Sequence, residues 1–171
     1  GAKENGGIFL HANPWVMIAE TMLGRGGRAY AYYCQINPAA KNEMIDVFEC
    51  EPYVYPQNIL GDEHPQFGLA RNAWLTGTAS WTYQAGVKYI LGIQPEFEGL
   101  RIDPCIPAEW DGFSAHRRFR GAIYNIRVEN PEHVNKGVST VRLDGKPVSG
   151  NLLPVFNDGG EHTVEVTMGR Q

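Results

Sequence analysis

Hydrophobic residues in the first part of the chain recur at intervals of three and four residues, which is the spacing of amphipathic helices. Two apolar stripes flank a glycine-rich stretch at 24–27: Trp15, Ile18, Ala19 and Met22 precede it, and Ala29, Tyr32, Tyr33 and Ile36 follow it. Asn13 is a favourable N-cap for the first helix, and Pro14 suits its first turn. Asn37 and Pro38 end the second helix. The pattern predicts two helices joined by a short turn, and then a long, mostly irregular loop at 39–70.

A third helix is predicted at 76–91. Its apolar face is formed by Ala79, Tyr83, Val87 and Ile90. The segment that opens it, 71–81, is polar, and Thr76, Gly77 and Thr78 place hydroxyls and an unobstructed backbone at the helix N-terminus. Unpaired N–H groups at such an end favour an anion. An N-cap threonine beside a packing glycine would give the same pattern, so the segment has both a functional and a structural interpretation.

From about residue 96 the period changes to the alternation of β-strands. The predicted strands are 100–103, 113–119, 122–129, 139–143, 152–155 and 163–168. Tyr124, Ile126 and Val128 alternate with polar residues and therefore share one face. Asp144 and Gly145 mark a hairpin turn. The predicted fold class is α+β, with helices in residues 1–95 and an antiparallel β-sandwich in residues 96–171.

Composition narrows the functional classes. The chain has 171 residues, of which 43% are hydrophobic and 20% charged, as expected for a globular protein with a core. Its net charge of −4 argues against a nucleic-acid surface. It contains no apolar run of about 18 residues and begins with no signal segment, so no membrane association is expected. Three cysteines without a C-x-x-C pair argue against a zinc site or a disulfide framework, and a reducing cytoplasm is expected.

The candidate chemistry lies in hydrogen-bond donors placed in loops. No recognisable pair of carboxylates suits glycoside hydrolysis, and G-x-S-x-G, P-loop and H-E-x-x-H motifs are absent. His11 precedes the first helix, Gln57 lies in the long loop, and Thr76 and Gly77 precede the third helix. Imidazole, amide, hydroxyl and backbone N–H groups that converge on one point would bind a phosphate. Each of these residues alone is more often structural.

Six segments carry a resemblance to a known family. They are 3–11 (KENGGIFLH), 14–20 (PWVMIAE), 51–57 (EPYVYPQ), 74–81 (WLTGTASW), 89–95 (YILGIQP) and 99–107 (GLRIDPCIP). In this order they resemble the C-terminal region of the inverting β-glucoside phosphorylases. That family includes cellobiose, cellodextrin, chitobiose, laminaribiose and cellobionic acid phosphorylases. The resemblance covers essentially the whole chain and is strongest from Lys3 to Phe119.

The resemblance implies both a fold and a site. Residues 1–95 would be the C-terminal helices and loops of an (α/α)6 barrel catalytic domain, and residues 96–171 a C-terminal β-sandwich domain. The phosphate-binding motifs of the family match at His11, Gln57, Thr76 and Gly77. Lys3 matches a lysine that lies near the acceptor sugar. No cofactor or metal is implied, because inorganic phosphate is the co-substrate.

The implied reaction is phosphorolysis. A β-linked glucosyl disaccharide or oligosaccharide would be cleaved by phosphate, with inversion, to α-glucose 1-phosphate and an acceptor sugar. Phosphate is already an anionic nucleophile, so no general base is needed. The general acid would be an aspartate upstream of this chain, which no motif here matches, so the chain alone is expected to be inactive. The implied partners are the sugar substrate, phosphate, the rest of the same enzyme and a second copy in a homodimer, with no nucleic acid or membrane.

Two other functional classes remain open. The strand-rich part could be a carbohydrate-binding module with Trp110, Phe113 and Phe119 as stacking platforms, although these aromatics would equally well pack the domain. A barrel glycoside hydrolase could have its base in sequence upstream. The loop at 55–66 differs from the sequence associated with cellobiose phosphorylases, so the disaccharide is not defined. Apolar helix faces that would meet the rest of a barrel are expected to be exposed in this chain.

Overall fold

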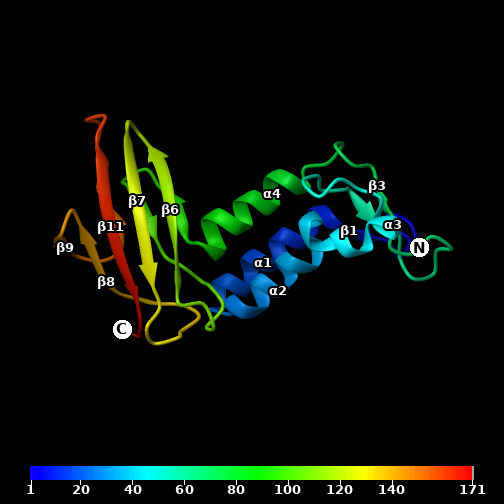
Figure 1. Cartoon of the computed structure of the whole chain (residues 1–171), viewed down its shortest axis with the longest axis horizontal. Coiled ribbons are helices and arrows are strands. Elements are labelled where there is room, and N and C mark those ends of the chain that lie inside the picture. Colours follow the sequence, from blue (N-terminus) through cyan, green and yellow to red (C-terminus); the bar gives the residue numbers. More distant parts are fainter. Residues whose placement is uncertain (171) are drawn as a thin grey trace. The chain divides into compact units, whose positions relative to one another are not determined.

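The computed structural model describes residues 1–170, in which helices precede most of the strands (Figure 1). The predicted α+β class is therefore confirmed. Contacts along the chain define two compact units, one of residues 1–19 and 29–86 and the other of residues 20–28 and the chain from Val87 onward. The predicted division into domains 1–95 and 96–171 stays a prediction, and Gln171 lies outside the described residues.

The two predicted N-terminal helices are present as α1 (Asn13–Met22) and α2 (Gly26–Ile36). The prediction that Asn13 is an N-cap is wrong. A 3-10 turn, η1 (Leu10–Ala12), runs directly into α1, so Asn13 already has helical backbone angles. Its Nδ2 donates to the carbonyl oxygen of Phe9 at 2.9 Å, and the side chain therefore stabilises the turn that precedes the helix.

The first unit has its own hydrophobic core. Its buried members are Leu10, Met17, Ile36, Phe48, Cys50, Val54, Ile59 and Ala85. The stripe predicted in the first helix lies largely outside this core, because Trp15 is 52% and Met22 is 74% exposed. Met17, which the predicted stripe did not include, is fully buried instead. The expectation that apolar helix faces are exposed in this chain is therefore confirmed for the first helix, whereas Ala29 and Ile36 of the second predicted stripe are buried.

The third predicted helix is present, but it begins at a later residue and its second half is a π-helix. Helix α4 (Thr78–Gln84) begins at Thr78 rather than residue 76, and it continues as a π-helix, η3 (Ala85–Ile90). The buried positions of α4 and η3 are Thr78, Thr82, Ala85 and Ile90, so of the predicted apolar face Ile90 is buried whereas Ala79 and Tyr83 are exposed. The Thr82 hydroxyl donates to the Thr78 carbonyl at 2.8 Å, so this buried polar side chain has a partner.

The prediction of a mostly irregular segment at 39–70 is wrong in part. Its first residues form a 3-10 helix, η2 (Pro38–Met44), and a short helix, α3 (Ile45–Phe48). The Asn37 side chain accepts a bond from the Ala39 N–H at 3.1 Å and so caps η2. Three two-residue strands then form an antiparallel sheet in the order β1 (Ile8–Phe9), β2 (Asn58–Ile59), β3 (Ala70–Arg71). A strand of two residues is too short for the alternation of polar and apolar residues to be visible in the sequence.

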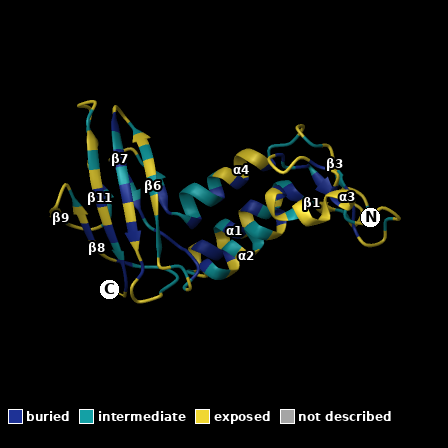
Figure 2. Cartoon of the chain, in the orientation of Figure 1, coloured by how far each residue is buried: buried dark blue, intermediate teal, exposed yellow. Residues whose placement is uncertain are grey.

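The second unit contains a five-stranded sheet. Its strands are β6 (Gly112–Phe119), β7 (Ala122–Glu129), β8 (Val138–Leu143), β9 (Lys146–Val148) and β11 (Glu161–Met168). Their order is β6-β7-β11-β8-β9, and β11 is parallel to β7 and antiparallel to β8. The antiparallel prediction is therefore wrong: β11 returns between β7 and β8, and the sheet is mixed. Tyr124, Ile126 and Val128 share one face of β7 as predicted, and that face is buried; Figure 2 shows the alternation along β7.

A second, three-stranded antiparallel sheet has the order β10-β5-β4. It consists of β4 (Ile93–Pro95), β5 (Leu100–Ile102) and β10 (Leu152–Leu153). Strands β4 and β9 were not predicted. The Tyr124 hydroxyl of β7 donates to the Pro154 carbonyl next to β10 at 2.6 Å. The predicted hairpin at Asp144 and Gly145 is confirmed, because Leu143 pairs with Lys146 and both turn residues have positive φ.

Three aromatic residues of this unit are all half-buried: Trp110, Phe113 and Phe119. The Phe119 ring packs against Tyr124 at 6.2 Å between centroids. The Trp110 carbonyl accepts a bond from Asn130 at 3.1 Å. The ring packing supports the structural interpretation of Phe119 over the role of a sugar platform.

A histidine with two acidic neighbours joins the β8–β9 hairpin to the start of β11. The Nδ1 of His162 lies 2.8 Å from Oδ2 of Asp144, and Nε2 lies 3.2 Å from Oδ2 of Asp158. Its ring stacks on Phe156 with 3.7 Å between centroids. The hydrogen bond to Asp144 raises the pKa of His162 above its usual value, and the same bond lowers the pKa of Asp144. Protonated His162 is thus stabilised by the folded state.

We expect this cluster to make the stability of the protein pH-dependent. Because the folded-state pKa of His162 is raised, its contribution is complete below the unfolded value of about 6.5 and is lost as the pH rises through the folded-state pKa. His162→Gln should therefore lower the melting temperature more at about pH 5.5 than at about pH 9. Thermal melts of the complete protein check this, with His116→Gln as the control, since His116 faces an amide oxygen of Asn125. Equal losses at both pH values would contradict the expectation.

Candidate active site

The structure brings two of the predicted phosphate-binding residues into contact. His11 lies in η1, and Gly77 immediately precedes α4. A Cβ atom at Gly77 would lie 2.9 Å from Cε1 of His11, which is closer than real Cβ contacts. The φ of Gly77 is −77°, so any residue could adopt its backbone conformation. Glycine at this position therefore matters because it leaves room for the imidazole ring.

Gln57 is attached to the same region through the backbone. Its carbonyl accepts a hydrogen bond of 2.9 Å from the N–H of Leu10, the residue before His11. Its own N–H donates to the carbonyl of Arg71 at 3.1 Å. The side-chain Oε1 accepts a bond of 2.8 Å from Nδ2 of Asn72. That bond orients the amide of Gln57 and leaves Nε2 as its donor.

Thr76 is held by local hydrogen bonds. Its Oγ1 accepts a bond of 3.1 Å from the Thr78 N–H and lies 2.7 Å from Oγ1 of Thr78, which is fully buried. Thr76 is therefore fixed beside Gly77 at the start of α4. The chain segments of His11, Gln57, Thr76 and Gly77 are thus joined by contacts or covalent neighbours. That their polar atoms meet at one anion stays a prediction.

Two tryptophans extend the site along the helices. Trp15 packs edge-on against His11 with 5.9 Å between centroids, and Trp81 packs edge-on against Trp15 at 5.6 Å. Each follows a predicted phosphate residue by four residues, since Trp15 follows His11 and Trp81 follows Gly77. Residues at this spacing are neighbours on a helix, and that signal could have identified both. Both side chains are partly exposed and offer flat surfaces that suit a sugar ring.

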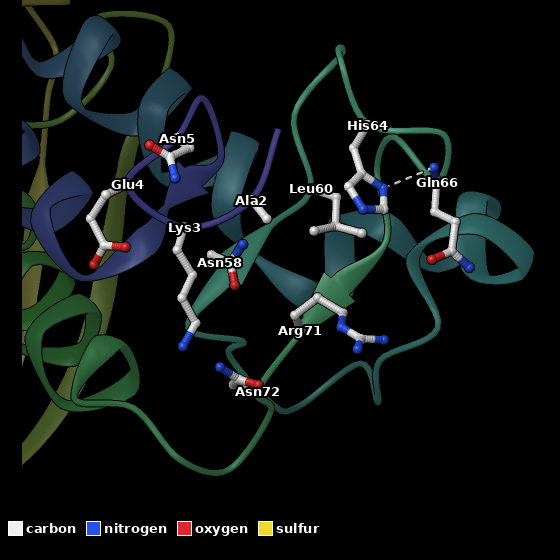
Figure 3. Close-up of a pocket in the computed structure, with 10 residues that line it drawn as sticks. All are labelled: Ala2, Lys3, Glu4, Asn5, Asn58, Leu60, His64, Gln66, Arg71 and Asn72. Atoms are coloured by element: carbon white, nitrogen blue, oxygen red, sulfur yellow. Dashed lines mark hydrogen bonds between the residues drawn. The ribbon is translucent and has the colours of Figure 1, made fainter.

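Lys3 lies in a neighbouring pocket of about 400 Å³ (Figure 3). The residues that line it are Ala2, Lys3, Glu4, Asn5, Asn58, Leu60, His64, Gln66, Arg71 and Asn72. Lys3 has a positive φ of 48°, and its carbonyl accepts a bond from the Gly7 N–H at 3.1 Å. A Cβ at Gly7 would lie 2.6 Å from the Lys3 nitrogen, so glycine there permits the tight turn. The pocket meets the phosphate residues through Asn72, which donates to Gln57.

Sequence reasoning missed the polar residues of this pocket. Asn58 directly follows Gln57, and Arg71 and Asn72 open the polar segment that precedes α4. Asn58 and Arg71 are partners across β2 and β3, so their side chains share one face of that sheet. Their closeness in sequence to the predicted phosphate-binding residues was the signal that could have identified them.

An exposed aromatic pair lies in the same unit. Trp74 and Tyr53 pack edge-on at 6.3 Å, and both are more than two-thirds exposed. The Trp74 Nε1 donates to Oε1 of Glu51 at 3.3 Å. Bonds from its own backbone N–H and from Trp74 lower the pKa of Glu51. Trp74 has a φ of 67°, which is unusual for a bulky residue and indicates a position imposed by its surroundings.

Within residues 1–170, no three or more His, Cys, Asp or Glu side chains are grouped to hold a metal ion. No helix in that range is both long enough and apolar enough to span a membrane. The thiols of Cys34, Cys50 and Cys105 are free, and burial raises the pKa of Cys105 to about 11. A pocket of about 530 Å³ that includes Phe113 lies beside β6 and β7.

The helices are followed in sequence by the two β-sheets, and the chain matches two known domain families in the same order. Residues 1–92 match the catalytic domain of the glycosyl hydrolase 94 superfamily, and residues 96–164 match the C-terminal domain of glycosyl hydrolase family 65. The chain belongs to the glycosyl hydrolase 94 superfamily. The resemblance to the C-terminal region of the β-glucoside phosphorylases is confirmed.

Three relatives are phosphorylases. The chain is 49% identical to N,N'-diacetylchitobiose phosphorylase from Vibrio proteolyticus and 46% identical to that from Vibrio furnissii, over 99% of its length in each case. It is 36% identical to solabiose phosphorylase from Paenibacillus borealis over 98% of its length. The alignments cover 21%, 21% and 22% of these relatives, so the chain spans about a fifth of their length.

Proposed function

We propose that the complete enzyme containing this chain is an inverting glycoside phosphorylase. It cleaves a β-linked disaccharide with inorganic phosphate and releases an α-sugar 1-phosphate, which is α-glucose 1-phosphate for a glucosyl substrate, and an acceptor sugar. The contact between His11 and Gly77 carries the proposal, because it joins two donor segments that are far apart in sequence. The names of the Vibrio relatives make N,N'-diacetylchitobiose the first substrate to test.

In this reaction the residues of this chain bind and orient phosphate. An imidazole N–H of His11, Nε2 of Gln57, the Thr76 hydroxyl and the Gly77 N–H donate to its oxygens. Hydrogen bonds to a charged group contribute roughly 1.5–3 kcal/mol each. One phosphate oxygen then forms a bond to the anomeric carbon as the glycosidic bond breaks on the opposite face. A carboxylic acid from the rest of the enzyme protonates the leaving oxygen, so the chain alone is inactive.

We also propose how the complete enzyme is built, where Lys3 lies in it and how many copies assemble. The helices are the last of an (α/α)6 barrel, and the two sheets form the layers of a β-sandwich domain, with the division at residues 95 and 96. Lys3 contacts the acceptor sugar from its pocket. The complete enzyme is a homodimer, and it needs phosphate as co-substrate rather than a cofactor. The exposed Met22 supports contact with further parts of the barrel.

Dependence on phosphate tests the function directly. The complete enzyme is incubated with N,N'-diacetylchitobiose, cellobiose and further disaccharides, with and without inorganic phosphate, and products are separated by chromatography. We expect sugar 1-phosphate to form only with phosphate present, and free sugars alone to be negligible. Release of two free sugars without phosphate would show a hydrolase instead. Binding of soluble glucans by this chain, with no phosphorolysis by the complete enzyme, would show a carbohydrate-binding module.

A further inference from the structure

A pair of threonine hydroxyls at the start of α4 can be hydrogen-bonded in either of two directions. Thr78 is 0% exposed, and within residues 1–170 the one hydrogen-bond partner of its Oγ1 is Oγ1 of Thr76, at 2.7 Å. Each hydroxyl has a single proton, so only one of the two can donate to the other. The direction of this bond decides what Thr76 can offer to a ligand.

The burial of Thr78 determines the direction. If Thr76 donated to Thr78, the proton of the Thr78 hydroxyl would be buried without an acceptor, and unpaired buried donors are rare and costly. If Thr78 donates to Thr76, the buried hydroxyl has its partner. Thr76 is only half-buried, and it then keeps its own proton for a partner outside the pair. We therefore take Thr78 as the donor of this bond.

This direction uses both lone pairs of the Thr76 hydroxyl. One lone pair accepts the backbone N–H of Thr78 at 3.1 Å, and the other accepts the Thr78 hydroxyl. The O–H of Thr76 is what remains, and the two accepted bonds leave it one of its three staggered positions. Thr76 is thus a donor whose proton is oriented before a ligand arrives.

A second proposed phosphate ligand has a similar support. The side-chain oxygen Oε1 of Gln57 accepts a bond of 2.8 Å from Nδ2 of Asn72, which leaves the NH₂ group of Gln57 for a ligand. At both positions a neighbouring donor from the same chain occupies an acceptor of the ligand residue. An arrangement that leaves donors free suits an anion.

We propose that Thr78 is a positioning residue for phosphate, because its buried hydroxyl donates to Thr76 and thereby directs the Thr76 O–H toward the anion. The inference rests on the proposed phosphorylase function, and it deepens that function by assigning a residue that acts without contact to phosphate. Thr76 and Gly77 bind the anion, and Thr78 holds the first of them. The three consecutive residues then form one functional unit at the start of α4.

The test removes the Thr78 hydroxyl and then restores it. Thr78→Val replaces the hydroxyl with a methyl group of similar size, and Thr78→Ser keeps the hydroxyl. Initial rates of the complete enzyme are measured at varied phosphate and fixed disaccharide. We expect Thr78→Val to raise the phosphate KM by about threefold or more, because the Thr76 O–H regains its other staggered positions. The disaccharide KM should change little, and Thr78→Ser should have a nearly normal phosphate KM.

Thr82→Val is the matched control. Thr82 is 1% exposed and lies one turn further along α4, where its hydroxyl donates to the Thr78 carbonyl at 2.8 Å. The same chemical change at the same depth should leave the phosphate KM unchanged. If Thr78→Val lowers the melting temperature strongly, Thr78→Ala decides instead, because alanine is smaller than threonine and cannot clash with its surroundings.

A double variant tests whether Thr78 acts through Thr76. Once Thr76→Ala has removed the ligand hydroxyl, adding Thr78→Val should cause no further rise in the phosphate KM. Additive losses overturn the positioning role, and so does a normal phosphate KM in a folded Thr78→Val enzyme; both leave the phosphorylase function intact. An unaltered enzyme without any phosphate-dependent reaction overturns the proposed function, and the role of Thr78 fails with it.

Discussion

Replacement of His11 by alanine is expected to raise the Michaelis constant of the complete enzyme for phosphate, or to lower its turnover, by about tenfold or more. The imidazole contacts the position of Gly77, and within residues 1–170 no hydrogen-bond partner occupies its ring nitrogens. Its loss would remove one charge-assisted bond to phosphate. The Michaelis constant for the disaccharide should change much less. Thr76→Ala should act in the same direction.

Initial rates at varied phosphate and fixed disaccharide measure this effect. His116→Ala is the matched control, because His116 is an exposed residue of β6 and should leave both constants unchanged. A thermal melt of each variant separates loss of phosphate binding from loss of folding. If His11→Ala uses phosphate normally, the imidazole does not belong to the phosphate site.

Elements with a long, regular period could be predicted from the sequence. Helices α1 and α2 and strands β6 and β7 each extend over eight or more residues and were predicted, and the predicted strand bounds 113–119 and 122–129 agree closely with β6 and β7. Strands β1, β2 and β3 have two residues each and form only because distant segments pair. The parallel position of β11 also depends on non-local pairing. The local pattern of polar and apolar residues does not show which distant strands pair.

In the candidate site, too, some residues could be predicted from the sequence and others only from the fold. His11, Gln57, Thr76 and Gly77 could be selected from their chemistry and from motif resemblance, but the contact of His11 with Gly77 required the fold. For Asn58 the sequence offered only its place next to Gln57, because the burial of its amide and the lack of a partner for Nδ2 are visible only in the fold. Asparagine in a loop usually satisfies its amide with solvent. The structure therefore added residues whose role depends on their surroundings.

The closeness of Gly77 to His11 makes a second strong prediction, for Gly77→Ala. The added Cβ would lie 2.9 Å from Cε1 and 3.5 Å from both ring nitrogens of His11, so the ring must move. The backbone at Gly77 suits alanine, and a side-chain ring can rotate, so the melting temperature should change little. Activity should nevertheless fall by about tenfold or more, because small displacements of a binding group strongly reduce rates.

Steady-state kinetics at varied phosphate check this prediction against Gly27→Ala. A Cβ at Gly27 meets no atom within 4 Å, and the residue lies within α2, so this control should keep full activity and gain slight stability. The double variant His11→Ala with Gly77→Ala tests the cause. If the alanine at position 77 acts by displacing the imidazole, the double variant should be no worse than His11→Ala alone. Additive losses would mean that Gly77 contributes through its own backbone N–H, independently of the histidine.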